Sequence, residues 1–142
     1  MKNTYTSIFL LIISSSLYGC YDVMTNWQLS ITNKADKNIS VLYTNHSHEA
    51  ENNIAYYTST QNIIMPDSSY DIITLGGKNA WHEYIKAGKT KTLYIYVFSV
   101  DTLKKYDESS SIYEIVDQHK YLKLLSYTEA DLNKISWHIV FK

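Results

Sequence analysis

The sequence predicts a mainly β domain, namely a two-layer antiparallel β-sandwich with two or three short helices in its C-terminal half. Several runs alternate apolar and polar residues, as half-buried strands do. Residues typical of helix starts cluster in the second half of the chain. The 142 residues are 45% hydrophobic and 19% charged, which is ordinary for a single folded domain and too apolar for a disordered chain.

Four strands are expected in the first half of the chain. Residues 27–32 alternate apolar and polar side chains. Turn-forming residues fill 33–38, so residues 39–43 are expected to return as the hairpin partner. Residues 44–53 predict a polar loop, and 54–57 have no assigned structure. Two further strands are expected over 63–65 and 70–75.

Asn79 is placed to cap a helix whose apolar residues share one face and which ends at Gly88. Residues 91–99 then predict the strongest strand. Since both of its faces are apolar, we expect a central strand covered on both sides.

Three helix starts are expected in the last third of the chain: Asp101 before 102–106, Ser111 with Glu114 as a capping box, and Thr128 with Asp131 as a second box before a turn through Lys134. Residues 121–127 predict a strand between them. Residues 135–141 alternate apolar and polar side chains and predict the closing strand.

The first twenty residues have the pattern of a secretory signal. Lys2 is followed by the apolar run 8–13, which is shorter than the roughly 20 residues that a membrane-spanning helix needs. The segment ends in Leu17-Tyr18-Gly19-Cys20, which resembles the bacterial lipobox. An aliphatic residue lies three positions before the Cys and a small residue directly before it, although Tyr18 departs from the small residue usual at that position.

In a lipobox, the Cys thiol takes a diacylglyceryl group and a peptidase then cuts before the modified residue. The sequence therefore predicts a signal peptide over 1–19, a lipidated tether over 20–26 and a single β-rich domain over 27–142. Two or three acyl chains hold a protein firmly at about 0.8 kcal/mol per buried CH₂, so a membrane is an expected partner. The alternative is an ordinary signal peptide with a chance Cys at position 20.

The C-terminal third carries a resemblance, through Ser99-Val100-Asp101-Thr102-Leu103, Ile112-Tyr113-Glu114-Ile115 and the closing Trp137-His138-Ile139-Val140-Phe141. Together with the lipobox, residues 91–142 resemble small lipoproteins of Bacteroides-type gut bacteria whose activity is uncharacterised. The resemblance implies an outer-membrane location, with the periplasmic or the outward face left open. It also implies that Thr102, in Asp101-Thr102-Leu103, is a candidate O-glycosylation site. A helix cap is the other explanation of Asp101.

Charge and composition exclude some functions. The net charge is −1 and all basic residues are Lys, which argues against nucleic acid as a partner. No Gly-x-Ser-x-Gly elbow and no Gly-rich phosphate loop occurs, so no catalytic residue and no cofactor are expected. His46 and His48 are weak candidates for a metal site, and a solvated loop is the favoured interpretation.

Aromatic residues make up 14% of the chain, including 14 Tyr. Exposed Tyr and Trp rings can stack on sugars or anchor a partner protein. Tyr56, Tyr57 and Trp81 are the candidates left after the alternating strands, and packing within the domain is their alternative role. The sequence therefore predicts a non-catalytic binding or accessory lipoprotein whose partner is a glycan or an envelope protein. The alternative is an envelope enzyme or a glycan-binding module of a polysaccharide-uptake system.

Overall fold

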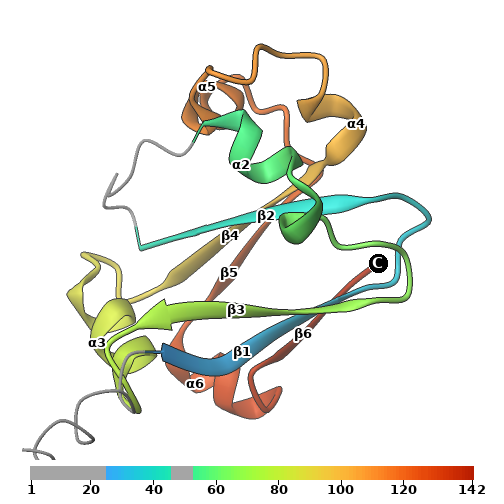
Figure 1. Ribbon diagram of the computed structural model, residues 1–142. Coiled ribbons are helices and arrows are strands. Elements are labelled where there is room, and N and C mark those ends of the chain that lie inside the picture. The colour runs from blue at the N-terminus through green and yellow to red at the C-terminus, as the bar shows by residue number, and fades with distance from the viewer. Residues whose placement is uncertain (1–24, 46–52) are drawn as a thin grey trace, which may run out of the picture.

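The computed structural model describes residues 25–45 and 53–142, which form two three-stranded sheets and several short helices (Figure 1). The described domain is therefore mixed α/β, which is consistent with the predicted mainly β class with short helices. The lipobox with Cys20 and the two histidines at 46 and 48 lie outside the described residues. Within the described ranges, no helix combines the length and the apolar character needed to cross a membrane.

The first sheet has the order β3-β1-β6 and contains β1 (Thr25–Asn33), β3 (Ser69–Leu75) and β6 (His138–Phe141). β3 runs antiparallel to β1, whereas β6 runs parallel to it. The wholly antiparallel prediction is therefore wrong for this sheet. A parallel neighbour requires a long crossover connection, which the chain between β1 and β6 supplies.

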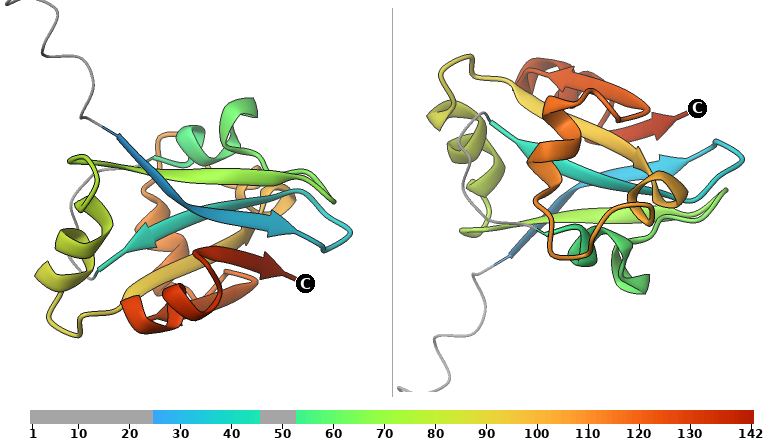
Figure 2. Two further views of the ribbon diagram at one scale, coloured as in Figure 1. Left: turned by 90° about the horizontal axis from the view of Figure 1, so that it is seen from below. Right: turned by 90° about the horizontal axis from the view of Figure 1, so that it is seen from above.

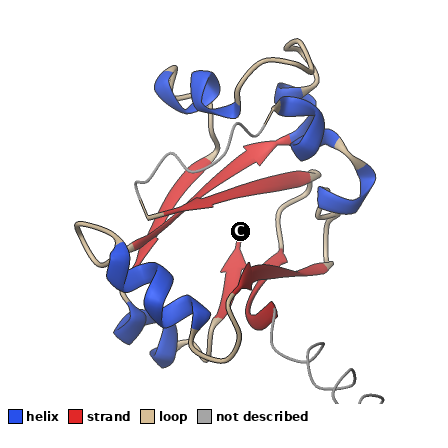
Figure 3. Cartoon of the chain, turned by 60° about the vertical axis from the view of Figure 1, so that its left-hand side comes forward, coloured by secondary structure: helices blue, strands red, loops and turns tan. Residues whose placement is uncertain are grey.

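The second sheet is antiparallel throughout and has the order β2-β4-β5. It contains β2 (Ile39–Thr44), β4 (Leu93–Ser99) and β5 (Lys123–Tyr127). β4 is the central strand, as the apolar character of both its faces predicted. Figures 2 and 3 show the two groups of strands with helices around them.

The predicted hairpin of 27–32 with 39–43 is wrong, because β1 and β2 belong to different sheets. Asn33 holds the turn that carries the chain between them. Its buried side-chain amide donates to the carbonyls of Lys37 (2.8 Å) and Ile64 (2.9 Å), and its oxygen accepts from the N–H of Ala35 (3.0 Å). Alternation describes each strand correctly but does not decide its neighbour.

Two apolar clusters lie on opposite faces of the β2-β4-β5 sheet. The first takes residues from both sheets, including Ile31 of β1 and Ile95 of β4. The second lies on the other face of β4 and includes Phe98. It is covered by α2 (Ile54–Thr58), α4 (Val100–Leu103) and α5 (Ile112–Asp117), which lie above this sheet in Figure 1. Alternate side chains of β4 thus enter two cores, which confirms a strand covered on both sides.

The predicted helix starts had mixed outcomes. The capping box of Thr128 with Asp131 is present at the start of α6 (Glu129–Lys134). Ser111 caps α5 through a bond from the N–H of Tyr113. α3 (Ala80–Ala87) forms as expected, but the side chain of Asn79 makes no capping hydrogen bond. Asp101 lies inside α4, which begins after Ser99, so the prediction that it caps a helix is wrong.

Other boundaries also moved. The second half contains four helices, α3 to α6, rather than two or three. The expected strand over 63–65 is reduced to a single bridge between Ile64 and Ile39, after the 3₁₀ helix η1 (Thr60–Asn62). The closing strand begins at 138 rather than 135, because Ser136 and Trp137 have positive φ angles of 52° and 59° and turn the chain.

Candidate functional site

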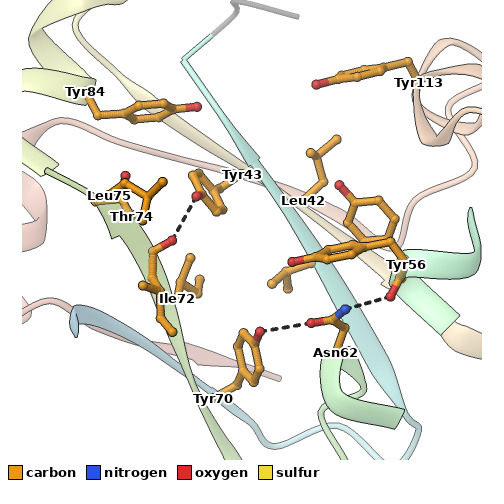
Figure 4. A pocket seen from close by; sticks show the side chains of 13 residues that line it. Leu42, Tyr43, Tyr56, Asn62, Tyr70, Ile72, Thr74, Leu75, Tyr84 and Tyr113 are labelled. Carbon is orange, nitrogen blue, oxygen red and sulfur yellow. Dashed lines mark hydrogen bonds between the residues drawn. The ribbon is translucent and has the colours of Figure 1, made fainter. Parts of the chain in front are cut away.

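A groove of about 630 Å³ lies between β2 and β3, which are edge strands of the two sheets (Figure 4). We call it the tyrosine groove. It is lined by Val41, Leu42, Tyr43, Tyr56, Tyr57, Asn62, Tyr70, Ile72, Ile73, Thr74, Leu75, Tyr84 and Tyr113. None of these described residues carries a charge. The volume is within the range of ordinary ligand sites, about 300–1,000 Å³.

The groove exists because the two sheets are joined on one side and separate on the other. Residues 128–137 connect β5 directly to β6, and α6 lies within this connection. β2 and β3 are also edge strands, but they are joined by side chains rather than by a strand ladder. The hydroxyl of Tyr43 reaches across and donates to the carbonyl of Ile73 over 2.9 Å.

The backbone of β2 presents to this groove hydrogen-bonding groups that pair with no backbone group of the described residues. The N–H of Val100 donates to the carbonyl of Asn38, and the N–H and C=O of Ile39 bond to Ile64 instead of β4. Hydrogen-bonded and non-bonded positions alternate along an antiparallel pair. The N–H and C=O groups of Val41 and Tyr43 therefore point away from β4. Across residues 25–45 and 53–142, these groups make no further backbone hydrogen bond.

Asn62 joins the two tyrosine-bearing walls of the groove. Its side-chain oxygen accepts from the hydroxyl of Tyr70 at 3.1 Å. Its amide donates to the carbonyl of Tyr56 at 2.8 Å and to the hydroxyl of Ser59 at 3.1 Å. Figure 4 shows the bonds from Asn62 to Tyr70 and to Tyr56, which link β3 and α2 through the last residue of η1. The hydrogen-bonding capacity of the Asn62 amide is thus used within the protein.

Tyr43 packs edge-on against two aromatic neighbours. The ring centroid of Tyr43 lies 5.2 Å from that of Trp81 and 5.7 Å from that of Tyr84, in the T-shaped arrangement that aromatic pairs favour. Burial raises the pKa of Tyr43, against a smaller lowering by its hydrogen bond to Thr74. Burial likewise raises the pKa of Tyr70. Both hydroxyls are therefore neutral at physiological pH and act as hydrogen-bonding groups.

The three aromatic residues singled out from the sequence have different environments. Tyr56 is 49% exposed at the groove, so its ring is open to a ligand. Tyr57 is 2% exposed and Trp81 1% exposed. Tyr57 lies one helical turn from Ile54 on the buried face of α2, and Trp81 lies on the buried face of α3. Both rings pack the cores, which was the alternative role considered for them.

Sequence patterns missed much of the groove. Tyr43 is half-buried against the first cluster. Tyr70, Tyr84 and Tyr113 come from separate elements, so their proximity depends on the tertiary fold. The sequence could have indicated the role of Tyr43 through its hydroxyl, because this residue lies on the inward face of a strand and a buried Tyr hydroxyl needs a hydrogen-bond partner.

The groove offers binding chemistry. Its described lining contains no carboxylate, imidazole or ammonium group that could transfer a proton. In the part of the chain that the structure describes, no three His, Cys, Asp or Glu side chains come together as a metal site. Thr102, the candidate glycosylation site, is half-buried in α4. Since Asp101 is not a helix cap, that explanation of the Asp101-Thr102-Leu103 pattern no longer applies.

No protein-family model, curated protein or solved structure matches this chain. The function is therefore inferred from the tyrosine groove and from the N-terminal sequence.

Proposed function

We propose that this chain is a lipid-anchored protein of the outer membrane that binds a partner in the tyrosine groove without catalysing a reaction. The groove between the two edge strands is the observation that carries the proposal. It combines an open aromatic ring, neutral hydroxyls and unpaired strand backbone, and its described lining is uncharged. These groups recognise a neutral ligand, whereas acid–base catalysis requires titratable groups at the site.

The position of the groove agrees with an envelope partner. Thr25, where the described domain begins, pairs with Leu75, which lines the groove. The five residues from Cys20 to Thr25 reach at most about 18 Å when extended. A lipid on Cys20 would therefore hold this end of the groove close to the membrane surface.

We also propose that the two sheets form the layers of a β-sandwich. The first apolar cluster supports this layout, because it draws buried side chains from strands of both sheets. In that layout the groove is the open side of the sandwich, and the connection through α6 closes the other side.

Glycan binding is the second candidate for this groove. Tyr56 favours it, because a ring that is 49% exposed can stack on the apolar face of a sugar. Modification of Thr102 is a separate prediction, for which a mass increase on the peptide containing residues 101–103 is the measurement.

Site-specific cross-linking tests the proposal. A photoreactive phenylalanine replaces Tyr56 in one variant and Leu124 in the control. Leu124 is 38% exposed and lies on β5, the edge strand opposite β2 in the β2-β4-β5 sheet. We expect a cross-linked adduct from intact cells with the probe at 56 and not at 124. The Cys20→Ala form of the first variant should lose the adduct, because the domain leaves the membrane. Equal adducts from both positions, or none from position 56, would contradict binding at the groove.

A further inference from the structure

We infer that the tyrosine groove accepts an extended, uncharged polypeptide segment that pairs with β2 as an additional antiparallel strand. This inference rests on the proposed function and names its ligand class. Strand addition takes its affinity from main-chain hydrogen bonds and its specificity from pockets for alternate side chains. The groove supplies both.

The main-chain groups come from the outer edge of β2. The N–H and C=O of Val41 and Tyr43 point away from β4, as the alternation of the ladder requires. Two such residues offer two donors and two acceptors with the spacing of a strand. On the facing strand, the carbonyl of Ile73 is already bonded to Tyr43. β2 is therefore the better template of the two edges.

The chain itself pairs with this edge at one position. The N–H of Ile39 donates to the carbonyl of Ile64 over 3.1 Å, and the N–H of Ile64 donates back over 2.8 Å. This bridge is antiparallel. Continued backward from Ile64, the same register would place residues 62 and 60 opposite Val41 and Tyr43. Residues 60–62 instead form η1, so among the described residues no backbone group pairs with Val41 or Tyr43 on this side of β2.

Side-chain space is available on both sides of that edge. Leu42 faces the helical side of the sheet, where Tyr56 also lines the groove. Val41 and Tyr43 face the opposite side, toward Ile72 of the other sheet. A strand placed along β2 would send successive side chains into these two regions. Since their described lining is uncharged and mostly apolar or phenolic, uncharged side chains with apolar residues at alternate positions fit best.

A peptide accounts for the free groups better than a sugar does. Sugar recognition requires side-chain hydrogen bonds, and the amide of Asn62 is already committed to Tyr56, Ser59 and Tyr70. The backbone groups of Val41 and Tyr43 bond to no other described backbone group, and they have the periodicity of a strand. An extended polypeptide matches that periodicity.

Two probes test the inference on the full chain purified in detergent: a displayed library of random linear decapeptides and a panel of neutral oligosaccharides. Enriched peptides are synthesised and titrated against wild type, Val41→Pro, Ser126→Pro and Tyr56→Ala. Val41→Pro removes an N–H that faces the groove, and edge strands tolerate Pro at such positions. Ser126→Pro is the matched control, because the N–H of Ser126 points away from β4 at the outer edge of β5.

We expect the enriched peptides to be uncharged and to carry apolar residues at alternate positions. Val41→Pro should weaken their binding at least about tenfold, since a hydrogen bond is lost and the Pro ring obstructs the edge. Ser126→Pro should have no effect. Methylation of every second backbone nitrogen of the peptide should weaken its binding, whereas methylation of the nitrogens between them should leave binding unchanged. This series uses wild-type protein, so it remains decisive if Val41→Pro does not fold.

Two results would overturn the inference while leaving the groove as the binding site. In the first, Tyr56→Ala weakens peptide binding but Val41→Pro and N-methylation do not. In the second, oligosaccharides bind in a manner that depends on Tyr56 and no peptide is enriched. If no probe binds, or if binding is indifferent to all three variants, both the inference and the proposed groove function fail.

Discussion

Tyr43→Phe tests the hydrogen bond that crosses the tyrosine groove. The substitution removes the 2.9 Å bond from the Tyr43 hydroxyl to the Ile73 carbonyl and keeps the ring, whose centroid lies 5.2 Å from that of Trp81. A neutral hydrogen bond contributes about 1 kcal/mol net. The Ile73 carbonyl lies at the open groove and can bond to water once the hydroxyl is gone. We therefore expect a loss of about 1 kcal/mol, with no added penalty for a buried unpaired group.

Urea unfolding followed by circular dichroism measures this loss. With a slope of about 2 kcal/mol/M, the midpoint should fall by about 0.5 M. Tyr127→Phe is the matched control, because its ring packs against the same core and its hydroxyl bonds to no other described residue. That variant should change stability by less than about 0.5 kcal/mol. Tyr43→Ala also removes the ring and should cost about 3 kcal/mol.

Equal stability of Tyr43→Phe and Tyr127→Phe would contradict this expectation. The bond between the edge strands would then contribute nothing, and the width of the groove would depend on packing alone. A loss for Tyr43→Phe as large as that for Tyr43→Ala would also contradict the reasoning. It would mean that the hydroxyl, rather than the ring, holds the two edges together.

Four further predictions follow from the sequence and the described contacts. Cys20→Ala should move the protein from the membrane fraction to the soluble fraction, and a mutant that still pellets with membranes contradicts the anchor. Asn33→Ala removes three hydrogen bonds made by a buried side chain and should cost about 3 kcal/mol by urea unfolding, whereas a cost below about 1 kcal/mol would show that the turn forms without them. Ser40 is fully buried, and its hydroxyl has no partner in the described part of the chain, so Ser40→Ala should leave stability unchanged or raise it by up to about 1 kcal/mol; a clear loss of stability would reveal a partner for this hydroxyl. Burial raises the pKa of Tyr43 and Tyr70 above the ordinary value of about 10. Their contribution to the free energy of unfolding is therefore complete below pH 10 and is lost as the pH rises through their folded-state pKa values. A free energy of unfolding that stays constant from pH 8 to 12 would contradict this.

Local patterns predicted which residues form strands and helices better than they predicted which strands pair with each other. The two apolar faces of 93–99 correctly indicated a central strand, because a strand buried on both sides has no polar face. The capping box at Thr128 was also readable, since both of its partners lie within one helical turn. The strands that pair with β1 could not be predicted in this way, because an alternating strand suits any neighbour with an apolar face.

The groove was harder to predict, because its residues come from six separate elements. Tyr56 was recognised as a candidate through its exclusion from the alternating strands. Tyr70 and Asn62 acquire their roles from a hydrogen bond between an edge strand and a 3₁₀ turn. The free edge of β2 depends on which strands pair, and the sequence pattern does not specify that choice.

Residue-resolved amide hydrogen exchange along β2 is the most direct test of the open edge on which the binding site depends. We expect slow exchange at Ser40 and Leu42, whose N–H groups bond to β4, and exchange about 100-fold faster at Val41 and Tyr43, whose N–H groups face the groove. Equally slow exchange at all four positions in the unliganded protein would contradict it, because the edge would then already be paired.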